Sequence, residues 1–144
     1  MPTVTLNKNN SVKHRFKTLD VSNLNAIVSA ARKGIKTKVF YDFAETIKMS
    51  EKNLASILNL SSRTISNHFQ AEKVLQPIYS EHLLKLISLY EKGEEIFGNI
   101  DEFNYWLRKP FWNKKAVPLD LVATAGGVDL INQELDKLAQ GYPV

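Results

Sequence analysis

The chain has 144 residues, 44% of them hydrophobic, which is enough to bury a core as one domain or as two small domains that share a helix. It has no cysteine, which excludes disulfides and thiolate metal sites and is typical of a reducing compartment. No apolar run approaches the roughly 20 residues of a membrane-spanning helix, and the polar start lacks the core of a signal peptide, so we expect a cytoplasmic protein without a membrane partner.

Positive charge is concentrated at the start of the chain. The formal net charge is +4, but residues 1–40 hold eight Lys or Arg and one acid, whereas residues 81–144 hold seven Lys or Arg and ten acids. Residues 1–18 show little apolar periodicity, which predicts a flexible basic segment. The alternative is an arm that contacts DNA phosphates through its cations, which are Lys8, Lys13, Arg15 and Lys17.

Two helices are predicted before residue 50. The first runs from Asp20 to Lys33, where apolar residues recur at three- and four-residue steps, and Gly34 ends it. The second covers about Val39 to Lys48 and has the same periodicity.

The stretch 54–69, with the sequence LASILNLSSRTISNHF, fits a helix-turn-helix motif whose first helix is capped by Ser50. Counted from Glu51 as the first of twenty positions, Ala55 falls at the fifth, where a small side chain lets the two helices cross closely. Ser61 falls where the second helix needs an N-cap acceptor. The core shared by the two helices and the turn is predicted to contain Leu54, Leu58, Leu60 and Ile65.

Two positions depart from the usual motif. Asn59 stands at position nine, where Gly is usual, and Asn is the next best residue for the left-handed conformation of a tight turn. His68 stands at position eighteen, which is usually apolar, and the neighbouring Phe69 is the candidate for the missing apolar contact. In that case the second helix would be rotated slightly relative to this register.

The outward face of the second helix predicts DNA contacts. In this register its side chains point toward a major groove, and only Arg63 among them is cationic. The predicted DNA-binding residues are Ser61, Ser62, Arg63, Ser66, Asn67 and Gln70. The competing interpretation is an ordinary helical domain, because any such domain has leucines at helical spacing and helices that begin at Ser.

The second half of the chain is also predicted to be helical, which makes the fold class all-α. Pro77 begins a long helix that is apolar on more than one face as far as Tyr90. Asn99 and Glu102 form a capping pair that opens a short helix, which ends before Pro110.

Two shorter elements complete the predicted fold. An irregular segment over 111–117 leads to Pro118, which heads a short turn of helix. The last helix is predicted to follow Gly126 and Gly127, and Gly141 ends it.

Catalytic and metal sites are not indicated by the sequence. His14, His68 and His82 lie on different elements, and no pair has the i, i+4 spacing of a helical metal site. Neighbouring acids such as Glu94 and Glu95 are typical of helix ends and solvated faces. We therefore expect a protein without catalytic activity, metal or cofactor.

Six fragments outside the helix-turn-helix motif occur in a characteristic order. They are ARKGI at 31–35, HLLKL at 82–86, EEIFGN at 94–99, YWLRKP at 105–110, VPLDLV at 117–122 and LAQGYPV at 138–144. The helix-turn-helix motif lies between the first and the second of them. In this order the fragments and the motif resemble the Xre/MbcA/ParS antitoxins, which join an Xre-like helix-turn-helix to a C-terminal toxin-binding domain. The likeness covers the chain from about residue 25 onward.

The resemblance implies a DNA-binding domain over residues 19–76 and a helical toxin-binding domain over residues 77–144. It implies a type II antitoxin that binds and inhibits a RES-domain toxin, an enzyme that degrades NAD, and that represses its own operon. Toxin contact is implied for Trp106, Arg108, Pro118, Leu119, Asp120, Gly141, Tyr142, Pro143 and Val144. The chain departs from the family at 111–113, where many members have glycines.

The end of the chain offers an independent physical argument for toxin contact. Gly141 lets the backbone leave the last helix sharply, and Pro143 stiffens the final residues. A carboxylate presented in this way could pair with the cations of a cleft that binds NAD phosphates. Otherwise these residues fray, as most chain ends do.

A homodimer is expected, because one small helix-turn-helix rarely binds DNA specifically alone and a palindromic operator matches two-fold symmetry. Two alternatives stay open. One is a stand-alone Xre-like transcriptional repressor, and the other is an antitoxin whose helix-turn-helix serves only dimerisation.

Overall fold

The computed structural model describes residues 11–111 and 115–141, and this part of the chain forms nine helices and no strand. The all-α prediction is therefore confirmed. An isolated β-bridge joins Lys36 and Val74. The helices are α1 (Val12–Arg15), α2 (Leu24–Lys33), α3 (Thr37–Thr46), α4 (Glu51–Ile57), α5 (Ser62–Gln70), α6 (Pro77–Phe97), α7 (Ile100–Leu107), α8 (Pro118–Leu121) and α9 (Ala125–Ala139).

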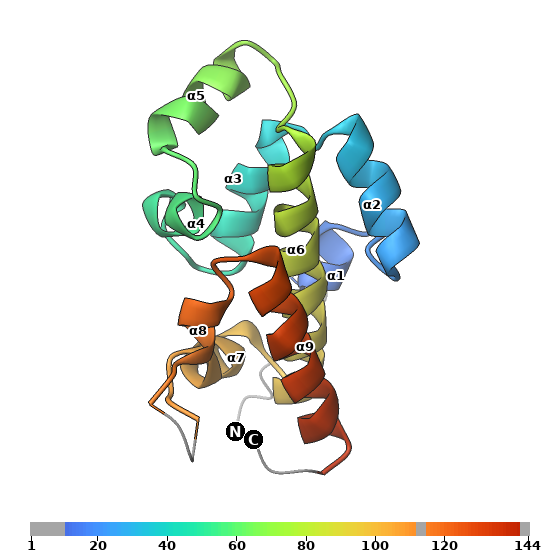
Figure 1. Cartoon of the computed structure of the whole chain (residues 1–144), viewed down its shortest axis with the longest axis vertical. Coiled ribbons are helices and arrows are strands. Elements are labelled where there is room, and N and C mark those ends of the chain that lie inside the picture. The colour runs from blue at the N-terminus through green and yellow to red at the C-terminus, as the bar shows by residue number, and fades with distance from the viewer. Residues whose placement is uncertain (1–10, 112–114, 142–144) are drawn as a thin grey trace, which may run out of the picture.

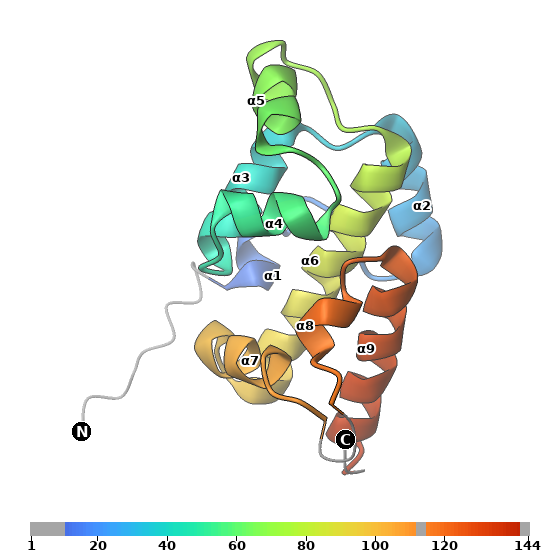
Figure 2. The same cartoon turned by 60° about the vertical axis from the view of Figure 1, so that its left-hand side comes forward.

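The long helix α6 runs through the middle of the molecule, and it packs against α1, α2, α7 and α9 (Figures 1 and 2). Pro77 occupies its first turn, where the missing N–H would have no helical partner. Its neighbour α9 runs parallel to it, and two ion pairs connect them: Lys85 Nζ lies 2.9 Å from Asp129, and Lys92 Nζ lies 2.7 Å from Asp136. The predicted two-sided apolar helix therefore has partners on more than one side, as its sequence requires.

A series of edge-to-face aromatic contacts connects both halves of the chain. Ring centroids lie 5.9 Å apart for Phe16 and Phe43, 5.4 Å for Phe43 and Tyr90, and 5.0 Å for Tyr90 and Phe103. These four residues belong to, or directly follow, α1, α3, α6 and α7. The helix-turn-helix part and the C-terminal part thus share one hydrophobic core, with Tyr90 at the junction.

Helix α2 begins four residues later than predicted from the apolar pattern. The Asp20 carboxylate accepts hydrogen bonds from the backbone N–H and the hydroxyl of Ser22, which hold the pKa of Asp20 below its ordinary value. Asn23 then caps the helix by accepting from the N–H of Ala26 at 2.8 Å. The side chains of this segment bond to nearby backbone and form a turn before the helix can start.

Helices α3 and α9, in contrast, start earlier than predicted. The sequence placed the first of these at about Val39, whereas α3 begins at Thr37. It placed the last helix after Gly127, but α9 begins at Ala125, because Thr124 Oγ1 accepts from the Gly127 N–H at 2.9 Å and caps it. Both glycines therefore lie in the first turn of the helix instead of in the loop before it.

The flexible segment predicted for residues 1–18 differs from the structure over residues 11–18. Val12 is fully buried and Phe16 is 5% exposed, because α1 packs on α3 and α6. The Val12 N–H also donates to Glu94 Oε1 at 2.9 Å. Residues 1–10, which include Lys8 of the predicted arm, lie outside the described residues.

The helices over 11–111 and 115–141 include none with both the length and the apolar character needed to cross a bilayer.

Candidate functional site

The helix-turn-helix forms between α4 and α5, as the sequence predicts. Ser50 Oγ accepts from the Asn53 N–H at 3.1 Å and caps α4, and Ser61 Oγ accepts from the Thr64 N–H at 3.0 Å and caps α5. Between the two helices, Asn59 has a φ of 60°, the left-handed conformation expected of it.

The motif's predicted core is largely confirmed. Ala55 is 1% exposed, which fits the close crossing of two helices at this position. Three of the other predicted core residues are buried, namely Leu54, Leu58 and Ile65, and the fourth, Leu60, is half-buried. The two helices are thereby fixed relative to each other, and α5 presents one face outward.

That face lies at one end of the molecule, and the C-terminal end of α9 lies at the other (Figures 1 and 2). Of the predicted DNA-binding residues, Ser66 is half-buried and the others are exposed, namely Ser61, Ser62, Arg63, Asn67 and Gln70. Exposed polar side chains on a protruding helix have the form that major-groove recognition requires.

Both residues around the unusual position eighteen make contacts. His68 is half-buried, and its Nδ1 lies 2.9 Å from the Thr64 carbonyl oxygen. Phe69 is 47% exposed, and its ring lies edge to face with Tyr41, with centroids 5.1 Å apart. Phe69 thus supplies part of the expected apolar contact while Ile65 remains the buried residue of α5.

The residues implied in toxin contact fall into an exposed set and a packed set. Arg108 and Asp120 are exposed, and the Arg108 guanidinium donates to the Asn104 carbonyl oxygen at 3.0 Å. Gly141 is also exposed and has a φ of 88°, which only glycine adopts easily. Residues 142–144, which complete the predicted tail contact, lie outside the described part of the chain.

The packed set supports the domain from inside. Pro118 is buried at the start of α8, and Leu119 is half-buried. Trp106 is half-buried and stacks on Phe103, with ring centroids 6.1 Å apart, and meets Phe111 edge to face at 6.4 Å. The ring contacts give Trp106 a packing role, as expected of an inward-facing residue of this helix, and burial gives Pro118 a packing role that the resemblance did not indicate.

An exposed aromatic residue beside Arg108 was missed by the sequence reasoning. Tyr105 is 61% exposed, and the Lys109 ammonium lies 4.6 Å from its ring centroid. The signal was the i, i+4 spacing of an aromatic and a cation on α7 and the residues after it. Together with Arg108 they make this end of α7 a cationic and aromatic surface, and Tyr and Arg are residue types that are enriched at protein interfaces.

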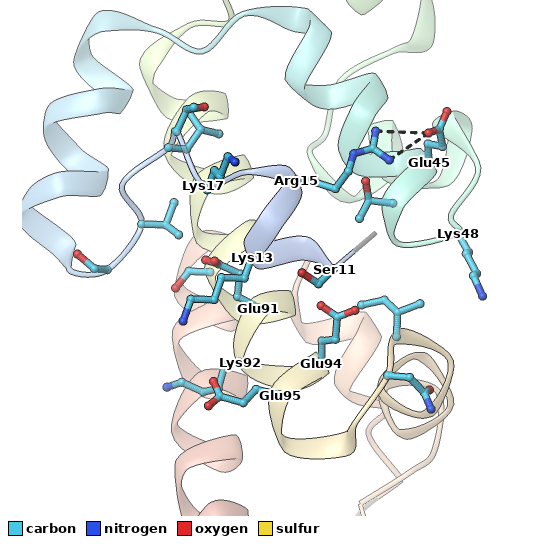
Figure 3. A pocket seen from close by; sticks show the side chains of 18 of the residues that line it. Ser11, Lys13, Arg15, Lys17, Glu45, Lys48, Glu91, Lys92, Glu94 and Glu95 are labelled. Atoms are coloured by element: carbon cyan, nitrogen blue, oxygen red, sulfur yellow. Dashed lines mark hydrogen bonds and ion pairs between the residues drawn. The ribbon is translucent and has the colours of Figure 1, made fainter. Parts of the chain in front are cut away.

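A surface groove lies between α1, the end of α3 and the second half of α6, and its side chains carry both signs of charge (Figure 3). Arg15 donates to Glu45 at 3.3 Å, and Glu94 accepts from the Val12 N–H. Burial raises the pKa of Glu91, while the nearby Lys13 opposes that rise. Two acids of this groove, Glu45 and Glu94, thus hold α1 on the rest of the molecule.

Within the described ranges, no three His, Asp or Glu residues gather in a way that could hold a metal ion.

His82 connects the middle helix α6 to the residue that follows α8. This side chain is 5% exposed, and its Nε2 lies 2.7 Å from the Val122 carbonyl oxygen, so a neutral ring donates from Nε2. Burial lowers the pKa of His82 below its ordinary value, and the hydrogen bond to Val122 acts in the opposite direction. Lys85 lowers the pKa further, and Glu81 raises it.

We expect the free energy of unfolding to fall as the pH drops below 6.5, the ordinary pKa of His, because the unfolded chain then takes up a proton that folded His82 resists. The stability that neutral His82 contributes is complete above that pH and is lost as the pH falls toward the lower folded pKa. Urea unfolding at pH 7.5 and 5.5 measures the loss. His82→Gln should show a smaller loss, and an equal loss in both proteins would contradict the assignment.

The fold and the turn between α4 and α5 define a helix-turn-helix protein with a second helical domain on the same core. A model of the antitoxin Xre-like helix-turn-helix domain matches residues 26–88, and a model of the antitoxin Xre/MbcA/ParS C-terminal toxin-binding domain matches residues 92–141. The chain therefore belongs to the Xre/MbcA/ParS antitoxins, which confirms the resemblance found in its sequence. No curated protein gave a significant match.

Proposed function

We propose that this antitoxin binds and inhibits a RES-domain toxin that degrades NAD, and that it represses its own operon through α5. The observation that carries the proposal is the presence of both antitoxin domains, in order, over residues 26–88 and 92–141 of one chain. We propose that the protein acts in the cytoplasm by binding alone, without catalysis.

The arrangement of the candidate surfaces supports binding of both partners at once. The exposed face of α5 and the end of α9 lie at opposite ends of the molecule (Figure 2). Arg108 and Asp120 are exposed in the C-terminal domain, so a toxin has polar side chains to contact there, and the backbone of Gly141 is exposed as well. We propose toxin contact at these residues, at Leu119 and along the tail after Gly141.

We also propose a homodimer on DNA. One α5 presents few side chains to a groove, and a single helix-turn-helix of this size gains specificity by binding two half-sites with two-fold symmetry. Sedimentation of the protein with a duplex of its own promoter would give the stoichiometry, and one protein per duplex at saturation would contradict the dimer.

The inhibition is tested with the product of the adjacent gene. The purified antitoxin, added at saturating ratio to a RES-domain protein encoded beside it, should abolish consumption of NAD. Undiminished consumption at that ratio would disprove the proposed inhibition, whatever the result with DNA.

A second candidate function keeps toxin binding and gives the helix-turn-helix only a dimerisation role. It is favoured by the low charge of the α5 face, where Arg63 is the one cation among the predicted DNA contacts. A gel shift with the promoter duplex at several salt concentrations separates the two, because phosphate contact makes affinity fall steeply with salt. Absence of any shift at low salt would favour the dimerisation role.

Two exposed arginines are expected to separate the two binding activities. Arg63→Ala should weaken operator binding by about 1 to 3 kcal/mol if its guanidinium reads a guanine, with toxin inhibition unchanged. Arg108→Ala is the matched control on the other surface, and it should weaken toxin inhibition with operator binding unchanged. Operator gel shifts and NAD assays on both variants measure this, and equal effects of both substitutions on both activities would contradict it.

A further inference from the structure

The C-terminal domain holds α4, the first helix of the helix-turn-helix, at both of its ends. Before α4, Asn104 Nδ2 donates to the Ile47 carbonyl oxygen at 2.9 Å, and Lys48 Nζ lies 3.0 Å from Asp101. After α4, Asn59 Nδ2 donates to the Ala123 carbonyl oxygen at 3.0 Å. In Figure 2, α4 accordingly lies between α5 on one side and α7 and α8 on the other.

The contact after α4 reaches the turn that orients α5. Asn59 is in the left-handed conformation, with φ of 60°, so its backbone sets the angle between α4 and α5. Glycine would meet that backbone requirement equally well, but it would supply no side-chain donor. The amide of Asn59 adds a hydrogen bond to a residue 64 positions away, on the C-terminal domain.

The loop that accepts this hydrogen bond is itself tightly held. His82 bonds to the Val122 carbonyl oxygen, and Thr124 caps α9 by accepting from the Gly127 N–H. A Cβ on Gly127 would lie 1.6 Å from the Leu121 carbonyl oxygen, which shows how closely α9 approaches the end of α8. Loop 122–124 therefore moves together with α8 and α9 and not independently of them.

We propose that the hydrogen bond from Asn59 to Ala123 transmits toxin binding to the DNA-reading helix. Asn59 is then a positioning residue, which acts on α5 through the turn and contacts neither ligand. The inference rests on the proposed function, because it needs a toxin on the C-terminal domain and an operator on α5. A toxin that contacts the exposed residues of α8 and the end of α9 sets the position of these two helices and of loop 122–124, which moves with them. The loop then holds the turn through Asn59, so operator affinity rises.

Coupling of this kind is reciprocal, so the operator must raise toxin affinity by the same factor. The test compares operator Kd with and without the toxin, using a duplex of the protein's own promoter and the RES-domain product of the adjacent gene. In the full-length protein we expect the toxin to tighten operator binding at least about 5-fold, the lower end of typical allosteric coupling. Asn59→Gly keeps the left-handed turn and removes the side-chain donor. In this variant the ratio of the operator Kd without toxin to the operator Kd with toxin should fall to within about twofold of one.

Glu72→Gly is the matched control. Glu72 comes after α5 and also has a positive φ, of 56°, but its backbone N–H donates to the Phe69 carbonyl oxygen at 3.1 Å. Its contact is thus local to the end of α5, whereas that of Asn59 reaches the C-terminal domain. Loss of the Glu72 charge shifts the operator affinity equally with and without the toxin. The ratio of the two Kd values in Glu72→Gly should therefore equal that of the unaltered protein. A merely structural role of Asn59 would change the melting temperature and leave the ratio of the two Kd values intact.

The outcomes separate the two proposals. An undiminished ratio in Asn59→Gly, or a ratio of one in the unaltered protein although it binds both partners, would overturn the coupling and leave the proposed function standing. If the unaltered protein failed to bind the toxin or failed to bind the operator, the proposed function would be overturned, and the coupling with it.

Discussion

Replacing Gly127 with Ala is expected to destabilise the protein by about 3 kcal/mol, at the upper end of the usual cost of overpacking. The added Cβ would lie 1.6 Å from the carbonyl oxygen and 2.7 Å from the carbonyl carbon of Leu121. Both are backbone atoms, so no rotamer change relieves the overlap, and α8 must move away from α9. The free energy of unfolding in urea measures the effect.

Gly126→Ala provides the control for the same substitution one residue earlier. An added Cβ on Gly126 meets no heavy atom within 4 Å, and the residue is exposed in the first turn of α9. The substitution should stabilise the protein by about 0.5 kcal/mol, because Ala loses less backbone freedom on folding. If the two variants unfolded at the same urea concentration, the close contact between Gly127 and Leu121 would be refuted.

The features that could be predicted from the sequence are those that depend on neighbouring residues. The caps at Ser50, Ser61 and Asn99 bond to an N–H three residues later, and the turn at Asn59 needs only its own backbone conformation. Local chemistry fixes such features, so the helix-turn-helix and the outward face of α5 can be derived from the amino-acid sequence.

The features that could not be predicted depend on distant partners. Val12 and Phe16 lie four residues apart, but one apolar pair is too short a pattern to predict a helix, and their burial becomes evident only when Phe43 and Glu94 are beside them. For the candidate site, a family motif identified Pro118 as a contact, but motifs do not distinguish a residue that packs from one that faces a partner. The hydrogen bond of Asn59 to Ala123 spans the two domains and leaves no local trace.

Tyr90 joins the two domains, so its truncation should weaken both binding activities together. Its ring is 1% exposed and lies edge to face with Phe43 of the helix-turn-helix part and Phe103 of the C-terminal part. Tyr90→Ala leaves a cavity at the centre of the shared core and should cost about 4 kcal/mol. Because the two domains have this core in common, we expect one cooperative unfolding transition, shifted as a whole to lower urea concentration.

Tyr90→Phe distinguishes the contribution of the ring from that of the hydroxyl. Burial raises the pKa of Tyr90, so the hydroxyl stays protonated, and it has no hydrogen-bond partner within residues 11–111 and 115–141. Phe keeps both ring contacts and removes the buried polar group, so stability should stay within about 1 kcal/mol of the original or rise. A large loss in Tyr90→Phe would show that the hydroxyl is bonded, and loss of only one binding activity in Tyr90→Ala would show that the domains fold separately.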